Sequence, residues 1–148
     1  MSYYKENMRK EAKKNSIIRK WYFFDVKGKT LGRIAVEISQ QLRGRSSLNF
    51  DYNKDLGNYV VVINSDKIIV SGNNKLLKKK YYNHSGYPGG LRERTLKIMI
   101  EKYSTELIHR IVKGLMPHNK LSKKQQTRLF VYSDENHPHN AQKGFLII

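Results

Sequence analysis

The sequence has no cysteine, only three prolines and few acidic residues, and each scarcity excludes a class of protein. Without cysteine, the chain can form neither a disulfide nor a cysteine-ligated zinc site. No apolar run approaches the roughly 18 residues that a membrane-spanning helix requires. The N-terminal stretch SYYKENMRKEAKKN has no apolar middle, so it does not resemble a secretion signal, and its glutamates are atypical of a transit peptide.

Positive charge is what the sequence has in excess. Lysine and arginine number 29 against 12 acids, which gives a net charge of +17 on 148 residues. A domain this basic repels itself unless an anionic partner neutralises it. Nucleic acid is the usual partner, because phosphate contacts supply most of the affinity of such proteins. We therefore expect a nucleic-acid partner, and neither a membrane nor a small-molecule substrate.

The segment from Lys75 to Arg94, KLLKKKYYNHSGYPGGLRER, concentrates this signal. It contains six Lys or Arg, three tyrosines, one histidine, three glycines and a single acid, Glu93. Cations can pair with phosphates, and tyrosine rings can stack on unpaired bases. Glycines let the backbone turn sharply and approach a partner closely, and Pro88 stiffens the turn. The simpler interpretation is a solvated loop with a tight turn, but the mixture favours an RNA-contacting surface.

Hydrophobic patterning predicts an α/β fold. Apolar runs over 21–26 and 59–63 read as strands, and the second suits a strand buried on both faces of a parallel sheet with helices on each side. Between them, apolar residues at helical spacing predict a helix that Thr30 caps and Gly44 ends. A short strand over 67–70 is also expected.

The second half of the chain continues the alternation of helices and strands. A long helix follows the glycine-rich segment and closes at Gly114 and Pro117. Its expected apolar stripe is Leu96, Met99, Ile100, Tyr103, Leu107, Ile108, Ile111 and Leu115. A short basic helix over 121–128 and a last strand over 129–132 complete the pattern. We expect one α/β domain over 21–148, with a central, largely parallel sheet flanked by helices, and a basic N-terminal extension over 1–20.

Two segments of the sequence partly match known phosphate-binding motifs, but each lacks an essential feature. Gly28-Lys29-Thr30 precedes a helix, yet a phosphate-binding loop needs a glycine five positions earlier, where Phe23 stands. The glycines around Pro88 follow no apolar strand, unlike the dinucleotide fingerprint. No nucleotide cofactor is therefore expected.

The histidines also lack the partners that a metal site or a catalytic site would need. His137 and His139 could hold one edge of a metal site, but no further ligands follow at suitable spacing. Ser85 stands beside His84, which does not by itself define a nucleophilic pair, because neighbours in sequence need not meet in space. We expect no metal and no catalytic site.

Five segments in the same order carry a family resemblance. They are WYFFDVKGKTLGRIAVEISQQLRG (21–44), LGNYVVVINSDKIIVSG (56–72), YYNHSGYPGGLRER (81–94), IVKGLMPHNKLSKK (111–124) and VYSDENHPHNAQK (131–143). Together they resemble the large-subunit ribosomal protein L-thirteen family in its bacterial or organellar form. The chain departs from the family pattern at Asn83, where arginine is common. Its apolar tail, 145–148, is expected to dock on the domain or on a neighbouring ribosomal protein.

The resemblance implies a structural role without catalysis: binding of large-subunit ribosomal RNA, support of subunit assembly, and contact with neighbouring ribosomal proteins. It places the chain in the ribosome, in the cytoplasm or in an organellar matrix or stroma. The residues expected to contact RNA are Arg43, Arg45, Lys78, Lys79, Lys80, Tyr81, His84, Tyr87, Gly89, Gly90, Arg92, Arg94, Lys113, Lys120, Lys123, Lys124, Arg128, His137 and Lys143. The alternative is a small RNA-processing enzyme that uses His84 or His137 as acid or base. It is disfavoured because the few acids are scattered.

Overall fold

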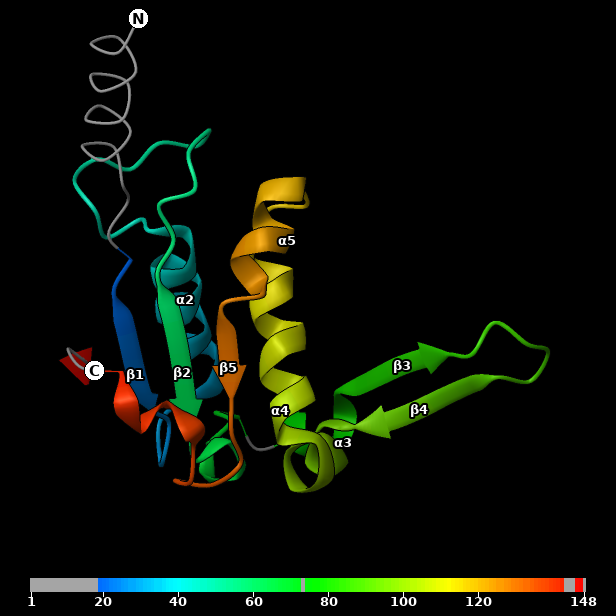
Figure 1. Ribbon diagram of the computed structural model, residues 1–148. Coiled ribbons are helices and arrows are strands. Elements are labelled where there is room, and N and C mark those ends of the chain that lie inside the picture. The colour runs from blue at the N-terminus through cyan, green and yellow to red at the C-terminus, as the bar shows by residue number, and fades with distance from the viewer. Residues whose placement is uncertain (1–18, 73, 143–145, 148) are drawn as a thin grey trace, which may run out of the picture.

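The computed structural model describes residues 19–72 and 74–142, and the backbone of 146–147 (Figure 1). A four-stranded sheet forms its centre, in the order β5-β2-β1-β6. The strands are β1 (Trp21–Asp25), β2 (Tyr59–Ile63), β5 (Leu129–Val131) and β6 (Leu146–Ile147). Every strand pair in this sheet is parallel, as expected. Residues 1–18 of the expected extension lie outside the described residues. Of the apolar tail, only the backbone of Leu146 and Ile147 is described, and it docks on the domain by pairing with β1.

Strand β2 has the burial that its apolar run predicts. Val60, Val61 and Val62 are all completely buried. Alternate side chains point to opposite faces, so Val60 and Val62 join Tyr22 and Phe24 of β1 in the main core, whereas Val61 faces the other way with Phe23. A strand that is apolar at every position is stable only where both faces are covered.

Helix α2 (Leu31–Arg43) covers one face of the sheet with the predicted stripe. Its buried residues include Ile34, Ile38 and Leu42, and Gly44 ends the helix in the left-handed conformation at φ 71°. The Thr30 side chain makes no capping hydrogen bond, so that expectation is wrong. Its backbone instead forms an isolated parallel bridge with Ile69, which anchors the start of the helix to the following segment.

Helix α4 (Leu96–Leu115) packs beside α2, but its apolar stripe changes phase at Tyr103. Tyr103 leaves helical geometry at φ −138° and ψ 39°, and the next buried residue after Met99 is Ser104. That step of five positions replaces the three or four of a regular stripe. Tyr103 and Leu115 are therefore exposed at 37% and 44%, contrary to expectation, while Val112, which was not expected, is buried. Helix α5 (Lys120–Gln126) follows close to its predicted bounds.

The strand expected over 67–70 is replaced by the short 3-10 helix η1 (Ser65–Lys67) and an extended stretch. Asn64 initiates this turn at φ 59°, a left-handed conformation that asparagine tolerates better than most residues. Its side-chain amide donates to the Asp25 carboxylate at 3.0 Å, which ties the ends of β1 and β2 together. That hydrogen bond, followed by one from the Lys27 backbone, lowers the pKa of Asp25.

The face of the sheet opposite α2 carries no long helix within the described residues, so the expectation of helices on both sides is only half right. It is covered by the 3-10 helix η2 (Pro138–Ala141), which crosses in front of the strands in Figure 1. The His137 ring lies 4.9 Å from Phe23, and the His139 ring lies 4.7 Å from Phe130. Burial, and secondly the nearby His137, lower the pKa of His139.

A second, two-stranded sheet stands apart from the first. Strands β3 (Lys80–His84) and β4 (Leu91–Thr95) pair antiparallel, and the short helix α3 (Lys75–Lys78) leads into them. Sequence patterning did not predict these strands, because polar and charged residues on both faces hide their alternation. No helix within the described residues is long and apolar enough to cross a membrane.

Candidate nucleic-acid interface

The β3–β4 hairpin projects from the body of the protein, as Figure 1 shows. It occupies most of the segment in which the sequence concentrates cations and tyrosines. The strands pair in register from Lys80 opposite Thr95 to His84 opposite Leu91. A two-stranded ribbon of this kind is marginally stable alone, so its attachment to the body decides its orientation.

The tip of the hairpin is a glycine-dependent loop. Gly86 and Gly89 adopt φ 91° and 71°, which side chains disfavour. A Cβ on Gly90 would collide with the Ser85 hydroxyl. The Ser85 backbone N–H donates to the Gly90 carbonyl at 3.2 Å, and the His84 ring Nδ1 accepts from the Gly86 N–H at 2.9 Å. The tip therefore has a defined shape, with Tyr87 76% exposed upon it.

One face of the hairpin docks on α4 through arginines and aromatic rings. The Arg94 guanidinium lies 4.1 Å from the Tyr103 ring and 3.5 Å from the Glu106 carboxylate. Arg110 donates to the Tyr82 carbonyl at 3.4 Å and to the Asn83 side chain, and it lies over the Tyr81 ring at 5.5 Å. These contacts hold the base of the hairpin against the body.

Tyr81 and Arg94 were expected to contact RNA, but this docking uses both side chains inside the protein. Both side chains are half-buried between the hairpin and α4 rather than displayed on the outside. Burial raises the pKa of Tyr81, and the charge of Arg110 offsets part of that rise. Arg110 was missed in the sequence, because nothing in a helical pattern shows which polar position will meet a distant hairpin.

The other cations of the hairpin region face solvent. Lys78, Lys79 and Arg92 are exposed, and Lys80 is exposed while paired with Glu93 at 2.8 Å. That hydrogen bond, followed by the charge of Glu93, raises the pKa of Lys80. Tyr82 is also exposed, at 53%, on the face of the hairpin away from α4. The exposed surface of the hairpin region thus contains both positive charges and aromatic rings, a combination that suits phosphates and unpaired bases.

A second group of expected cations gathers at the opposite end of α4. It comprises Arg43, Arg45, Lys120, Lys123 and Lys124. All five except the half-buried Arg43 are exposed. Helix α5 is started by Asn119, whose side-chain oxygen accepts from the Ser122 backbone N–H at 2.7 Å. The hairpin precedes α4 and docks on it through Tyr103, Glu106 and Arg110, whereas this group flanks the end of α4, so the two basic surfaces lie on different parts of the molecule.

The remaining expected residues have different surroundings. Arg128 is only 9% exposed, and its guanidinium binds the Asp55 carboxylate and the Gly57 carbonyl. Its charge is thus used inside the protein. Lys113 is exposed on α4, and His137 is half-buried on the sheet. Lys143 lies outside the described residues.

The two histidines offered for acid–base chemistry do not form a site. His84 sits at the tip of the hairpin, whereas His137 packs on Phe23 at the central sheet. The described residues also contain no group of three or more His, Asp or Glu that could hold a metal ion.

Comparison with known proteins identifies the family. The model of the family described as ribosomal protein L13 matches residues 19–138. The "Large ribosomal subunit protein uL13" of Ureaplasma parvum is 49% identical over 129 residues, covering 87% of this chain and 86% of the relative. That of Desulfitobacterium hafniense is 46% identical over 132 residues, covering 89% and 92%. The chain therefore belongs to the ribosomal protein L13 family, which is structural and non-enzymatic, so the alternative of an RNA-processing enzyme is wrong.

Proposed function

We propose that this protein binds large-subunit ribosomal RNA as a structural constituent of the large ribosomal subunit and supports the assembly of that subunit. The observation that carries the proposal is the β3–β4 hairpin, a projecting arm with exposed cations and rings on a base fixed to α4. The names of the relatives, which are large-subunit proteins, support the same assignment.

The hairpin is suited to enter folded RNA rather than to lie on a flat surface. Lys78, Lys79 and Arg92 are exposed and able to pair with phosphates. Tyr87 and Tyr82 are available for stacking on unpaired bases. The docked base reduces the freedom that the arm would lose on binding, which favours affinity.

The basic group around α5 supplies the second half of the surface. With one basic surface on the hairpin and another around α5, the protein can contact two separate RNA segments. A protein that holds two segments at a fixed distance helps a large RNA to fold, and this is the basis of the proposed assembly role. We place the protein in the ribosome of the cytoplasm, or of an organellar matrix or stroma, beside other large-subunit proteins.

The test removes one exposed cation at a time. Arg92→Ala should lower the salt slope of binding to large-subunit ribosomal RNA by about 0.7–0.9, the contribution of one phosphate. Arg92→Lys is the matched control, because it keeps the charge, and it should retain the slope. Neither variant should change the melting temperature, since the side chain is exposed.

A second experiment asks whether the tip of the hairpin touches RNA. Val at Gly89 cannot comfortably adopt φ 71°, so Gly89→Val should distort the tip while leaving the distant core intact. Chemical footprinting of the assembled subunit should then lose protections that the wild-type protein confers. Unchanged protections with normal incorporation would show that the hairpin is not the RNA anchor. Failure of the wild-type protein to sediment with large subunits would overturn the whole proposal.

A further inference from the structure

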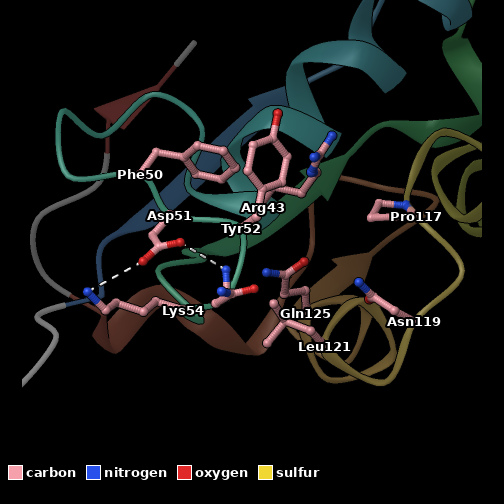
Figure 2. A pocket seen from close by; sticks show the side chains of 10 residues that line it. Arg43, Phe50, Asp51, Tyr52, Lys54, Pro117, Asn119, Leu121 and Gln125 are labelled. Carbon is pink, nitrogen blue, oxygen red and sulfur yellow. Dashed lines mark hydrogen bonds and ion pairs between the residues drawn. The ribbon is translucent and has the colours of Figure 1, made fainter.

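A hollow of about 250 Å³ lies beside the second basic surface (Figure 2). One wall comes from the end of α2 and the loop that follows it, and the other from α5 and the segment that joins it to α4. Figure 2 shows Phe50 and Tyr52 on the side of the first wall, with Asn119 and Gln125 across from them. The volume is below the roughly 300–1,000 Å³ typical of pockets for larger ligands, so a single small group would fill it.

Gln125 contributes a side-chain amide to the wall of this hollow. The residue is only 4% exposed, and α5 holds it among the residues that line the space. A ligand that displaces water from an amide must replace the hydrogen bonds of that water, so an occupant with a polar edge is favoured. The amide offers both a donor and an acceptor to whatever occupies the space.

A neighbouring amide adds a donor to the same wall. The Asn119 side-chain oxygen is committed to the Ser122 backbone N–H at 2.7 Å. Its NH₂ group is therefore the part left to bind a ligand, and Asn119 lines the hollow together with Gln125. The two amides together offer donors and an acceptor, which match the edge of a nucleobase because it presents the same groups.

An exposed aromatic ring stands on the opposite wall. Tyr52 is 70% exposed, although a ring of this size usually buries more of its surface. Phe50 supports it edge-on, with the ring centroids 5.1 Å apart and the planes at 70°. The free face of the Tyr52 ring is thus available to stack on a planar group.

The charges around the hollow disfavour a phosphate inside it. Asp51 lines the wall, paired with Lys54 at 3.4 Å and accepting from the Asn53 backbone N–H at 3.1 Å. Its carboxylate would repel an anion, whereas a neutral base with amino groups would be accepted. Arg43 also lines the hollow, and it can bind a phosphate outside while the base lies within.

From these contacts we infer that the hollow receives a single unstacked nucleobase of the bound RNA. The base stacks on Tyr52, and its edge binds the amides of Gln125 and Asn119. The inference rests on the proposed function, and it adds a base-specific contact to a surface that otherwise offers only charge.

The first experiment titrates the full-length protein with the four nucleoside 5′-monophosphates and follows the side-chain amides by NMR. At least one nucleotide should shift the Gln125 amide signals, and Tyr52→Ala should weaken that binding about tenfold, in line with loss of one stacked base. Tyr52→Phe keeps the ring and should bind as the wild type does. Ribose 5-phosphate is the matched ligand without a base, and equal shifts with it would overturn the inference in favour of a phosphate site.

The second experiment uses large subunits reconstituted with wild-type, Tyr52→Ala or Leu48→Ala protein, with ultraviolet cross-linking and mass spectrometry of the linked peptides. Leu48 is in the same loop, fully exposed and outside the hollow, so its variant is the control. A nucleotide linked to the Tyr52 peptide, and lost in Tyr52→Ala, supports the inference. RNA links at the hairpin with none at this loop, or a link from this loop to another protein, overturn it while leaving the proposed function intact. Absence of RNA links anywhere overturns both.

Discussion

Replacing Asp55 by asparagine should destabilise the fold, because it removes the charge that holds Arg128 inside the protein. Arg128 is 9% exposed, and its guanidinium donates from Nη1 to the Asp55 carboxylate at 2.9 Å and to the Gly57 carbonyl at 3.1 Å. A second nitrogen binds the other carboxylate oxygen. Arg19 adds a weaker contact with Asp55 at 3.5 Å.

The cost follows from what the variant leaves behind. Removing one partner of a buried ion pair costs roughly 3–5 kcal/mol, since the other charge stays buried. Asparagine keeps one acceptor, and the Asp55 side chain is 20% exposed, so we expect a smaller loss of about 2–3 kcal/mol. For a chain of this length, that corresponds to a fall in melting temperature of about 6–12 °C.

The pH dependence gives an independent check. Burial raises the pKa of Asp55, but the hydrogen bond and charge of Arg128 outweigh it, so the pKa is lowered overall. The pair therefore contributes its full stability above the unfolded pKa of about 3.9 and loses it as the pH falls through the lower folded value. The difference in melting temperature between wild type and Asp55→Asn should accordingly shrink below about pH 4.

Circular-dichroism melts from pH 7 to pH 3 measure both effects. Asp51→Asn is the matched control from the same loop, because its pKa is also lowered, chiefly by the Asn53 backbone N–H, but its pairing with Lys54 is exposed. It should melt as the wild type does at neutral pH. If Asp55→Asn melts together with Asp51→Asn across the whole range, Arg128 is not held as described.

Further variants test the packing. Gly44→Ala should lower the melting temperature more than Gly28→Ala: both glycines have φ 71°, but a Cβ at Gly44 would collide with backbone whereas Gly28 has open space. Arg110→Ala should speed hydrogen exchange of the hairpin amides, with little change in the core amides, because it removes the contacts of the hairpin with α4. Ile38→Ala should cost about 2–5 kcal/mol in denaturant unfolding, since Ile38 is completely buried, whereas the exposed Lys124→Ala should leave stability unchanged.

Local patterns in the sequence were sufficient where one element buries a regular face. The continuous apolar run of β2 and the spacing of Ile34, Ile38 and Leu42 in α2 predicted both elements and their burial. These patterns are direct consequences of strand and helix geometry, so they do not depend on the rest of the chain. Together with the five collinear motifs, they predicted the α/β class and the family that the comparisons then confirmed.

Contacts between distant segments were decided only by the tertiary structure. Arg128 reads as one more surface cation until Asp55, 73 positions away, is placed against it. Arg110 gains its role only when the hairpin folds back on α4. Side-chain type shows what a residue can bind, but the choice among partners depends on which segments meet.

The hollow beside α5 is likewise a feature that the tertiary structure shows and the sequence does not. The sequence contains Tyr52 and Gln125, but their separation of 73 positions gives no sign that they line one space. Net charge predicted an anionic partner, because charge sums over the chain without regard to shape. The hollow that we infer to receive a base is formed only where α5 and the 50–54 loop come together, so only the tertiary structure could reveal it.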